Sequence, residues 1–287
     1  MLIGIHSVVV EVGDFEAAVD AFARLLDRRA RVGPGARCAV FGLGNARLAV
    51  RGRGARGTSG APLEPARDGL VGLRLAMRSE DAGRLAAGPL ESPTVPIELV
   101  AESARAAEDG TGADAGADRE PGLGREAVER IEAGIIGLDH VVIATGDPER
   151  TRAFLADELG IRLALDRAFP ERGLRLLFFR LGGVTLELAA ALPPQSTSGG
   201  RVDEERDALA HGSPRAARAE AADTFHGLAF KVRGLEATRA RLEGAGFALS
   251  AIRAGHKAGT RVCSLRAPLC GIPTLLIEHP PRPGEGG

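Results

Sequence analysis

The chain of 287 residues carries a formal net charge of −1 at pH 7, and 26% of its residues are charged. This near-neutral balance argues against binding to nucleic acid or to an anionic membrane, because such proteins normally carry a basic excess. Phe supplies all of the 3% aromatic content, since Trp and Tyr are absent, which excludes a tyrosine acid and an aromatic cage for a cation. The expected partner is therefore a small-molecule substrate, with no nucleic acid and no membrane.

The cysteines indicate a reducing compartment. Cys38, Cys263 and Cys270 are odd in number and lack CxxC spacing, so they predict neither a disulfide framework nor a zinc knuckle. No apolar stretch approaches the ~18 residues that span a bilayer, and the N-terminus shows no basic segment before an apolar run. We therefore expect a cytoplasmic protein.

An internal repeat organises the chain. The segment IGIHSVVVEVGDFEAAVDAF from Ile3 aligns with IGLDHVVIATGDPERTRAFL from Ile136, 133 residues later. Each copy predicts a β-branched strand, a Gly-Asp turn and an amphipathic helix with apolar residues at i, i+3, i+4 and i+7. In the second copy Asp147 suits a helix N-cap, Pro148 suits the first helical position, and Gly160 suits the residue just after the helix.

Further strands complete this second copy and then repeat. Three strands are predicted after its helix, at Ile161–Asp166, Leu174–Leu181 and Val184–Ala190. The pattern restarts at Phe225 with a strand and a helix. Three more strands are predicted there, at Phe247–Ile252, Thr260–Leu265 and Thr274–Glu278. The C-terminal half thus predicts two βαβββ units.

The N-terminal half repeats the pattern incompletely. A second unit begins at Val71, but little chain follows it, so we expect a truncated unit. Two segments fall outside the pattern and are predicted, from their polar composition, to be a flexible linker at 102–134 and a polar insertion at 193–222. The resulting domains are 1–101 and 135–281, followed by a tail at 282–287.

Paired βαβββ units that open with GLDHVVI and reopen with FHGLAFKV resemble the vicinal oxygen chelate superfamily, which includes glyoxalases, methylmalonyl-CoA epimerases, extradiol dioxygenases and bleomycin-resistance proteins. The resemblance covers 136–279 well and 3–101 more weakly, and the tail of the last strand resembles uncharacterised glyoxalase-like proteins. It implies an α+β fold in which paired units form an open, curved eight-stranded sheet around a cup. We expect a well-formed C-terminal copy and a degenerate N-terminal copy.

The resemblance implies metal ligands inside the cup, taken from the first and last strands of each unit. His140 falls on the first-strand position, and strand alternation places it on the face of Val142. Glu187 falls on the fourth-strand position. Because Glu187 is flanked by Leu186 and Leu188, its carboxylate needs a metal or an Arg as partner if it points inward. We predict that His140 and Glu187 approach each other inside the cup.

The other two ligand positions are less regular. The alignment puts Gly227 on the fifth-strand position and His226 one residue early, where a regular strand would turn it to the other face. A β-bulge at Gly227 would return His226 to the cup. In the last strand, counting from Gly271 selects Leu275, whereas a Pro-Thr-Leu-x-x-Glu pattern selects Glu278, which we prefer.

The N-terminal half is not expected to hold a metal. Its equivalent positions are Ser7, Ala49, Gly72 and Glu98. We expect it to be a structural or dimer-forming copy of the fold, so that a homodimer is the expected assembly.

Two functions follow from the resemblance. The first is a glyoxalase-like, metal-dependent lyase, isomerase or dioxygenase that acts on a small oxygenated metabolite by bidentate chelation. His140, Glu187, His226 and Glu278 would hold a divalent ion (Fe, Mn, Ni or Zn), and Glu187 would also be the catalytic base. The alternative is a metal-free protein of the bleomycin-resistance type, whose cup binds and sequesters a small molecule.

A basic run precedes the last strand. Arg253, His256, Lys257 and Arg261 fall in a Gly-rich turn between two predicted strands. They are read either as a solvated hairpin or as a substrate-binding clamp for carboxylate or phosphate at the cup mouth.

Overall fold

The computed structural model describes residues 1–33, 37–54, 67–81, 88–103, 131–192 and 222–281. Most of the predicted linker and insertion and all of the predicted tail lie outside these residues, so the domain boundaries remain predictions. Within the described ranges, no helix combines the length and apolar character needed to cross a membrane.

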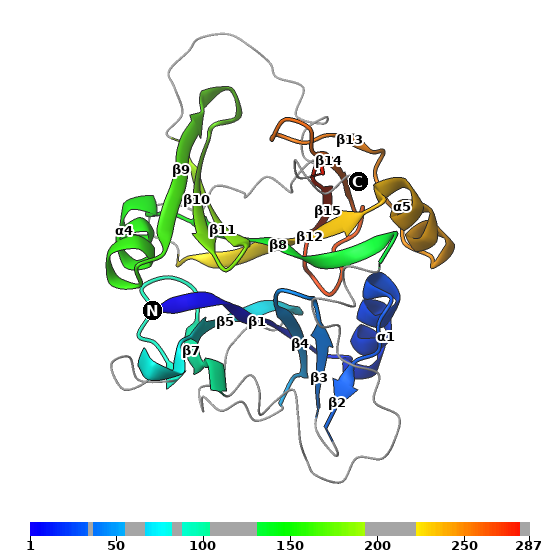
Figure 1. Ribbon diagram of the computed structural model, residues 1–287, viewed down its shortest axis with the longest axis horizontal. Helices are drawn as coiled ribbons and strands as arrows, with labels where there is room; N and C mark the ends of the chain where they lie inside the picture. Colours follow the sequence, from blue (N-terminus) through cyan, green and yellow to red (C-terminus); the bar gives the residue numbers. More distant parts are fainter. Residues whose placement is uncertain (34–36, 55–66, 82–87, 104–130, 193–221, 282–287) are drawn as a thin grey trace.

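The C-terminal half forms one curved eight-stranded sheet from two βαβββ units, as the sequence predicts (Figure 1). The strand order is β13-β14-β15-β12-β8-β11-β10-β9. The strand bounds are β8 (Gly134–Thr145), β9 (Arg162–Phe169), β10 (Leu174–Leu181), β11 (Val184–Ala191), β12 (Thr224–Arg233), β13 (Arg253–Ala254), β14 (Arg261–Ser264) and β15 (Thr274–Glu278). The central strands β8 and β12 pair antiparallel, and each pairs in parallel with the last strand of its own unit, β11 or β15.

Local signals explain the first helix of this half. Helix α4 (Pro148–Ala153) continues as a π-helical turn, η2 (Phe154–Glu158). The Asp147 side chain accepts a hydrogen bond from the Arg150 amide at 3.0 Å, and Gly160 takes the positive φ of 64° that ends such a segment. The predicted N-cap, first-turn proline and terminal glycine are therefore confirmed.

One predicted strand is wrong. The segment Phe247–Ile252 makes only an isolated bridge between Leu249 and Leu265. The Leu249 carbonyl accepts from Arg266 Nε at 3.0 Å, and the Ser250 carbonyl accepts from Arg239 Nε at 3.2 Å. The Ser250 amide still donates to the Ser264 carbonyl at 2.9 Å, but the Ser264 amide donates to Ser250 Oγ at 3.0 Å instead of to the Ser250 carbonyl. The second helix of this half, α5 (Leu235–Gly244), lies where the sequence predicts it.

The N-terminal half forms a seven-stranded sheet in the order β2-β3-β4-β1-β5-β7-β6. Its strand bounds are β1 (Leu2–Val12), β2 (Arg31–Val32), β3 (Cys38–Gly42), β4 (Arg47–Gly52), β5 (Gly69–Met77), β6 (Gly88–Pro89) and β7 (Ile97–Ala101). Helix α1 (Phe15–Leu26) follows β1, whereas β5 is followed only by a 3-10 turn, η1 (Ser79–Asp81), in the described residues. The predicted degenerate copy is thus present, and two strands of its second unit follow β5.

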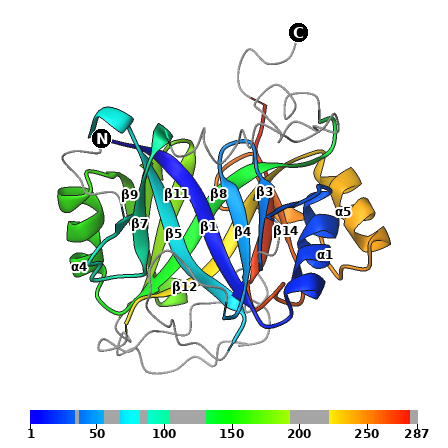
Figure 2. The same cartoon turned by 90° about the horizontal axis from the view of Figure 1, so that it is seen from below.

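The two sheets pack back to back, with their concave faces turned away from each other (Figures 1 and 2). A single buried apolar cluster joins them, and it includes Val8 and Leu73 of one sheet and Val141 and Leu186 of the other. The Asn45 side chain adds a polar tie. Its Nδ2 donates to the carbonyl of Leu138 at 2.8 Å, and its Oδ1 accepts from the Leu138 amide at 2.9 Å.

Candidate functional site

His140 and Glu187 meet on the concave face of the C-terminal sheet. Strands β8 and β11 pair in parallel, with Thr185 beside His140 and Val142 beside Glu187. The alternate residues, such as Leu186, lie in the core shared by the two sheets. The distance from His140 Nε2 to Glu187 Oε2 is 3.9 Å. The predicted approach of these two side chains is confirmed.

A β-bulge brings a second carboxylate to His140. In the pairing of β8 with β12, Leu138 lies opposite Phe230 and His140 opposite Ala229, so Asp139 is an extra residue. Asp139 Oδ2 accepts a hydrogen bond from His140 Nδ1 at 2.9 Å. Its Oδ1 accepts a hydrogen bond from His279 Nε2 at 2.6 Å. Sequence reasoning missed both Asp139 and His279, because adjacent residues of a regular strand face opposite sides.

The electrostatics of this group reflect burial and close partners. Burial raises the pKa of Asp139, but the hydrogen bonds from His140 and His279 outweigh it and hold that pKa well below its usual range. Burial lowers the pKa of His140, but the bond to Asp139 and the charge of Glu187 outweigh it and raise that pKa. Burial raises the pKa of Glu187 more than the charges of His140 and His226 lower it.

Glu187 has no hydrogen bond among the described residues, although its side chain is only 15% exposed. Two arginines of the same sheet, Arg180 and Arg261, have other partners. Arg180 Nη1 donates to Thr185 Oγ1 at 2.7 Å, and Arg261 forms ion pairs on the opposite face of the sheet. The buried carboxylate therefore faces the cup with imidazoles as its ionisable neighbours.

His226 sits on a second β-bulge, at the place where the sequence allows one. Phe225 lies opposite Ile143 and Gly227 opposite Val142, so His226 is the extra residue. A Cβ at Gly227 would lie 2.8 Å from the Pro273 carbonyl oxygen, which explains the glycine. His226 is among the groups whose charge lowers the pKa of Glu187, with an effect smaller than those of burial and of the charges of His140 and Asp139. Within the described residues, no three His, Cys, Asp or Glu side chains are gathered closely enough to hold a metal ion.

Glu278 is not brought to this site. Its Oε1 accepts from the Leu235 amide at 3.1 Å, at the start of α5, and its Oε2 accepts from Arg261 Nε at 2.9 Å. Alternation in β15 explains the difference, because Leu276 of the same face packs in the shared core. Leu275 instead lies beside Ala229, the partner of His140. The register counted from Gly271 is thus the one that faces the cup.

The basic run divides in the same way. Arg261 forms ion pairs with Glu236 and Glu278, so its side chain lies outside the cup. His256 stays at the mouth, in the turn between β13 and β14, where Arg172 Nη1 donates to its Nε2 at 3.1 Å. Arg253 and Lys257 flank it, on β13 and in the turn.

Side-chain contacts at this mouth connect the two edges of the curved sheet, β9 with the turn that follows it and the turn after β13. The ring of Phe169, at the end of edge strand β9, lies 6.3 Å from the ring of His256. The guanidinium of Arg167 lies over Phe169 at 4.9 Å. Arg167 and Arg172 were not predicted as site residues, although an arginine on each side of Phe169 was visible in the sequence.

The N-terminal copy keeps the two bulges and loses the site. His6 is the extra residue that corresponds to Asp139, and Val71 is the extra residue that corresponds to His226. Ser7 and Ala49 occupy the places of His140 and Glu187. Val9, Ala49 and Val71 form a small apolar cluster instead.

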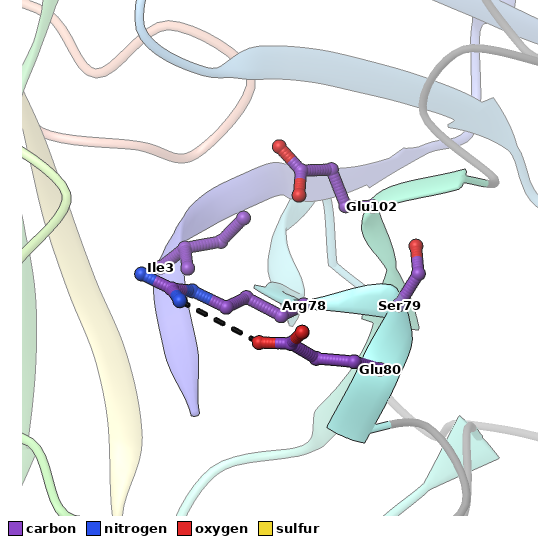
Figure 3. A pocket seen from close by; sticks show the side chains of 5 residues that line it. All are labelled: Ile3, Arg78, Ser79, Glu80 and Glu102. Atoms are coloured by element: carbon purple, nitrogen blue, oxygen red, sulfur yellow. Dashed lines mark ion pairs between the residues drawn. The ribbon is translucent and has the colours of Figure 1, made fainter.

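An open hollow lies elsewhere on the N-terminal sheet (Figure 3). It is lined by Ile3, Arg78, Ser79, Glu80 and Glu102. Arg78 Nη1 lies 3.5 Å from Glu80 Oε1, and both side chains are more than half exposed, so their ion pair contributes little. The C-terminal cup remains the candidate site.

The fold and the site define a class of protein. One curved sheet made of two βαβββ units, with ionisable side chains from its first and last strands on the concave face, is the vicinal oxygen chelate architecture. Residues 139–263 match the family model of the Glyoxalase/Bleomycin resistance protein/Dioxygenase superfamily. The matched part of the chain contains His140, Glu187 and His226.

Solved structures with two such copies share the fold over nearly the whole chain. A mutant of 4-hydroxymandelate synthase from Streptomyces coelicolor has a TM-score of 0.59 at 17% identity, over 100% of this chain and 95% of that one. The 2,2',3-trihydroxybiphenyl 1,2-dioxygenase from Sphingomonas wittichii has a TM-score of 0.58 at 13% identity, over 97% and 91%. A halotolerant catechol dioxygenase has a TM-score of 0.58 at 12% identity, over 97% and 87%. No protein of curated function matches the sequence.

Proposed function

We propose that this protein is a glyoxalase-like, metal-dependent enzyme that acts on a small oxygenated metabolite in the C-terminal cup. One observation carries the proposal. Glu187 is a buried carboxylate that receives no hydrogen bond among the described residues, and its Oε2 lies 3.9 Å from His140 Nε2. Because an ionised carboxylate is costly to bury without a partner, the site calls for a cation or a polar ligand.

The donor chemistry supports a divalent metal. His140, His226 and Glu187 are the two-imidazole, one-carboxylate set that suits Fe(II) or Mn(II) and leaves coordination positions for substrate. The hydrogen bond from His140 Nδ1 to Asp139 is the type that orients metal-binding histidines. Two ligands of one ion lie about 3.0 to 3.4 Å apart, so the 3.9 Å between His140 Nε2 and Glu187 Oε2 would need to shorten by roughly 0.5 to 0.9 Å. When bound, the metal would polarise a substrate oxygen as a Lewis acid.

Glu187 is proposed as the catalytic base. The pKa of this carboxyl is raised by burial, which moves it toward the range where a base works well near neutral pH. Its place on the concave face gives a substrate access to its oxygens.

The test is metal stoichiometry of protein purified without a His tag and reloaded separately with Fe(II), Mn(II), Ni(II) or Zn(II). Wild type should hold about one ion per chain, and His140→Ala and Glu187→Gln should lose it. Glu278→Gln is the matched control, because that carboxylate lies on the other face, and its metal content should equal that of wild type. Equal metal content in all four proteins would refute the site.

The alternative is a metal-free cup that binds and sequesters a small molecule. It is favoured by the absence, among the described residues, of three side chains gathered closely enough for a metal. Failure of wild type to bind any of the four ions would favour this function over the enzyme.

The mouth supports an anionic substrate with an apolar body. Arg167, Arg172 and His256 lie together there, and guanidinium groups bind carboxylate and phosphate well. Below them, Leu165 lies opposite Phe178 on the concave face and is 49% exposed.

This substrate class predicts a difference between matched ligands. In a thermal-shift series, small aromatic carboxylates should stabilise wild type more than their uncharged amides, since only the former can pair with the mouth. Arg172→Ala should reduce that difference by several-fold, whereas Arg78→Ala in the distant hollow should leave it unchanged. Equal shifts for acids and amides would contradict an anion-binding mouth.

A further inference from the structure

We propose that Asp139 and His279 are positioning residues that hold His140 in the tautomer whose Nε2 is bare and turned toward Glu187. The inference deepens the proposed function. Only its consequence for metal binding rests on that function, because the tautomer itself can be observed in the metal-free protein.

The geometry is a chain of three side chains, two from β8 and one from the residue that follows β15. Asp139 Oδ2 lies 2.9 Å from His140 Nδ1, and Asp139 Oδ1 lies 2.6 Å from His279 Nε2. An ionised carboxylate only accepts hydrogen bonds, so each imidazole must donate the proton it shares with Asp139. The His140 proton is therefore on Nδ1, and Nε2 is left to face Glu187 at 3.9 Å.

His279 fixes the far oxygen of Asp139. It follows β15 and, by alternation, lies on the same face as Leu275 and Ile277 rather than with Glu278. Its ring therefore reaches Asp139 across the sheet, from the last strand of one unit to the first strand of the other. With both oxygens bound, the carboxylate cannot rotate away from His140.

The N-terminal copy shows that the bulge does not itself require a carboxylate. The equivalent extra residue there is His6. Its Nε2 accepts from Arg47 Nη1 at 2.5 Å, and its Nδ1 lies 3.2 Å from the hydroxyl of Ser7, which replaces His140. The same backbone irregularity thus accommodates a different side chain where the site is lost. We infer that Asp139 serves His140 rather than the fold.

The direct test is the ¹⁵N NMR spectrum of the imidazoles in metal-free protein, measured above the pH at which His140 ionises. The chain has six histidines, so a His140→Gln spectrum assigns the signal. Wild-type His140 should be the Nδ1–H tautomer. In Asp139→Ala it should become a mixture of both tautomers, and in His279→Ala the change should be in the same direction and smaller. His256→Ala, at the mouth, is the control and should leave the His140 signal unchanged.

The second readout is metal affinity. Loss of a carboxylate that orients a metal-binding histidine typically weakens binding by about 10–100-fold, which is the range expected for Asp139→Ala. His279→Gln, which retains an N–H donor, should restore most of the affinity lost in His279→Ala. If Asp139→Ala does not fold, Asp139→Asn replaces it, because its single amide oxygen can accept from only one of the two histidines.

The outcomes separate the two claims. A wild-type Nε2–H tautomer, or an unchanged tautomer in Asp139→Ala and Asp139→Asn, would overturn the positioning role. The expected tautomer change in a protein that binds none of the metals would support the positioning role and reject the metal site.

Discussion

At the residue scale, the site combines groups whose burial is unfavourable for folding. Glu187 is a buried carboxylate with a raised pKa and without a hydrogen bond among the described residues. Glu278 is a carboxylate of the same half that is fully engaged by Arg261 and by the start of α5. Replacement by Gln should therefore stabilise the protein at Glu187 and destabilise it at Glu278.

We predict that Glu187→Gln stabilises the metal-free protein at pH 8. A carboxyl whose folded pKa is raised contributes stability below its unfolded pKa, and this contribution is lost as pH rises through the folded pKa. Wild type should therefore lose stability between pH 5 and pH 8, and Glu187→Gln should lose less. The gain in the free energy of unfolding at pH 8 is expected to be about 1.4 kcal/mol for each unit by which the folded-state pKa is raised.

Urea unfolding at both pH values measures this, with Glu278→Gln as the control. That control should be less stable than wild type, because it removes the negative charge and one of the two oxygens that accept from Arg261 and from the Leu235 amide. A Glu187→Gln protein that is destabilised at pH 8 would show that the carboxylate has a favourable partner in the folded state.

At the element scale, two bulges decide which residues reach the cup. Strand alternation was sufficient to predict the approach of His140 to Glu187, because β8 and β11 are regular where they pair. It was not sufficient for Asp139, since a one-residue irregularity places neighbouring side chains on the same side. The face of Glu278 was mispredicted because two patterns gave two registers for β15, and only packing of Leu276 in the core selects one.

We predict that Gly227→Ala disturbs the second bulge. The new Cβ would lie 2.8 Å from the Pro273 carbonyl oxygen, a backbone atom that cannot move without shifting β12 or the start of β15. We expect overpacking to lower the free energy of unfolding by about 1–3 kcal/mol. Metal binding should also weaken, because His226 would move.

Thermal unfolding and metal titration check this prediction against Gly244→Ala. Gly244 ends α5, and a Cβ there would meet no atom within 4 Å, so that variant should be as stable as wild type or slightly more so. If Gly227→Ala matches Gly244→Ala in both measurements, the close approach does not constrain the bulge.

At the scale of the whole molecule, the degenerate N-terminal copy supports the functional one. Its convex face supplies part of the single core on which β8 and β12 lie (Figure 2). Helix contacts add to this, since Arg241 of α5 donates to the carbonyls of Arg24 and Leu25 at the end of α1, both at 2.9 Å. The repeat in the sequence predicted two copies, but it held no information on which faces would pack together.

We therefore predict that the protein unfolds in one cooperative transition. Asn45→Ala should lower the midpoint temperature of that transition. Asn45 binds both the amide and the carbonyl of Leu138, the residue before Asp139, so its loss leaves two backbone groups without their partner at the junction of the sheets. The expected loss in the free energy of unfolding is about 1–3 kcal/mol, and it should affect both halves because they share one core.

Scanning calorimetry should show a single peak that moves to lower temperature without splitting. Glu80→Gln, in the exposed Arg78–Glu80 pair of the open hollow, should leave the peak in place. Two separate peaks in wild type, or a shift confined to one of them in Asn45→Ala, would mean that the copies fold independently and that the N-terminal half does not hold the site in shape.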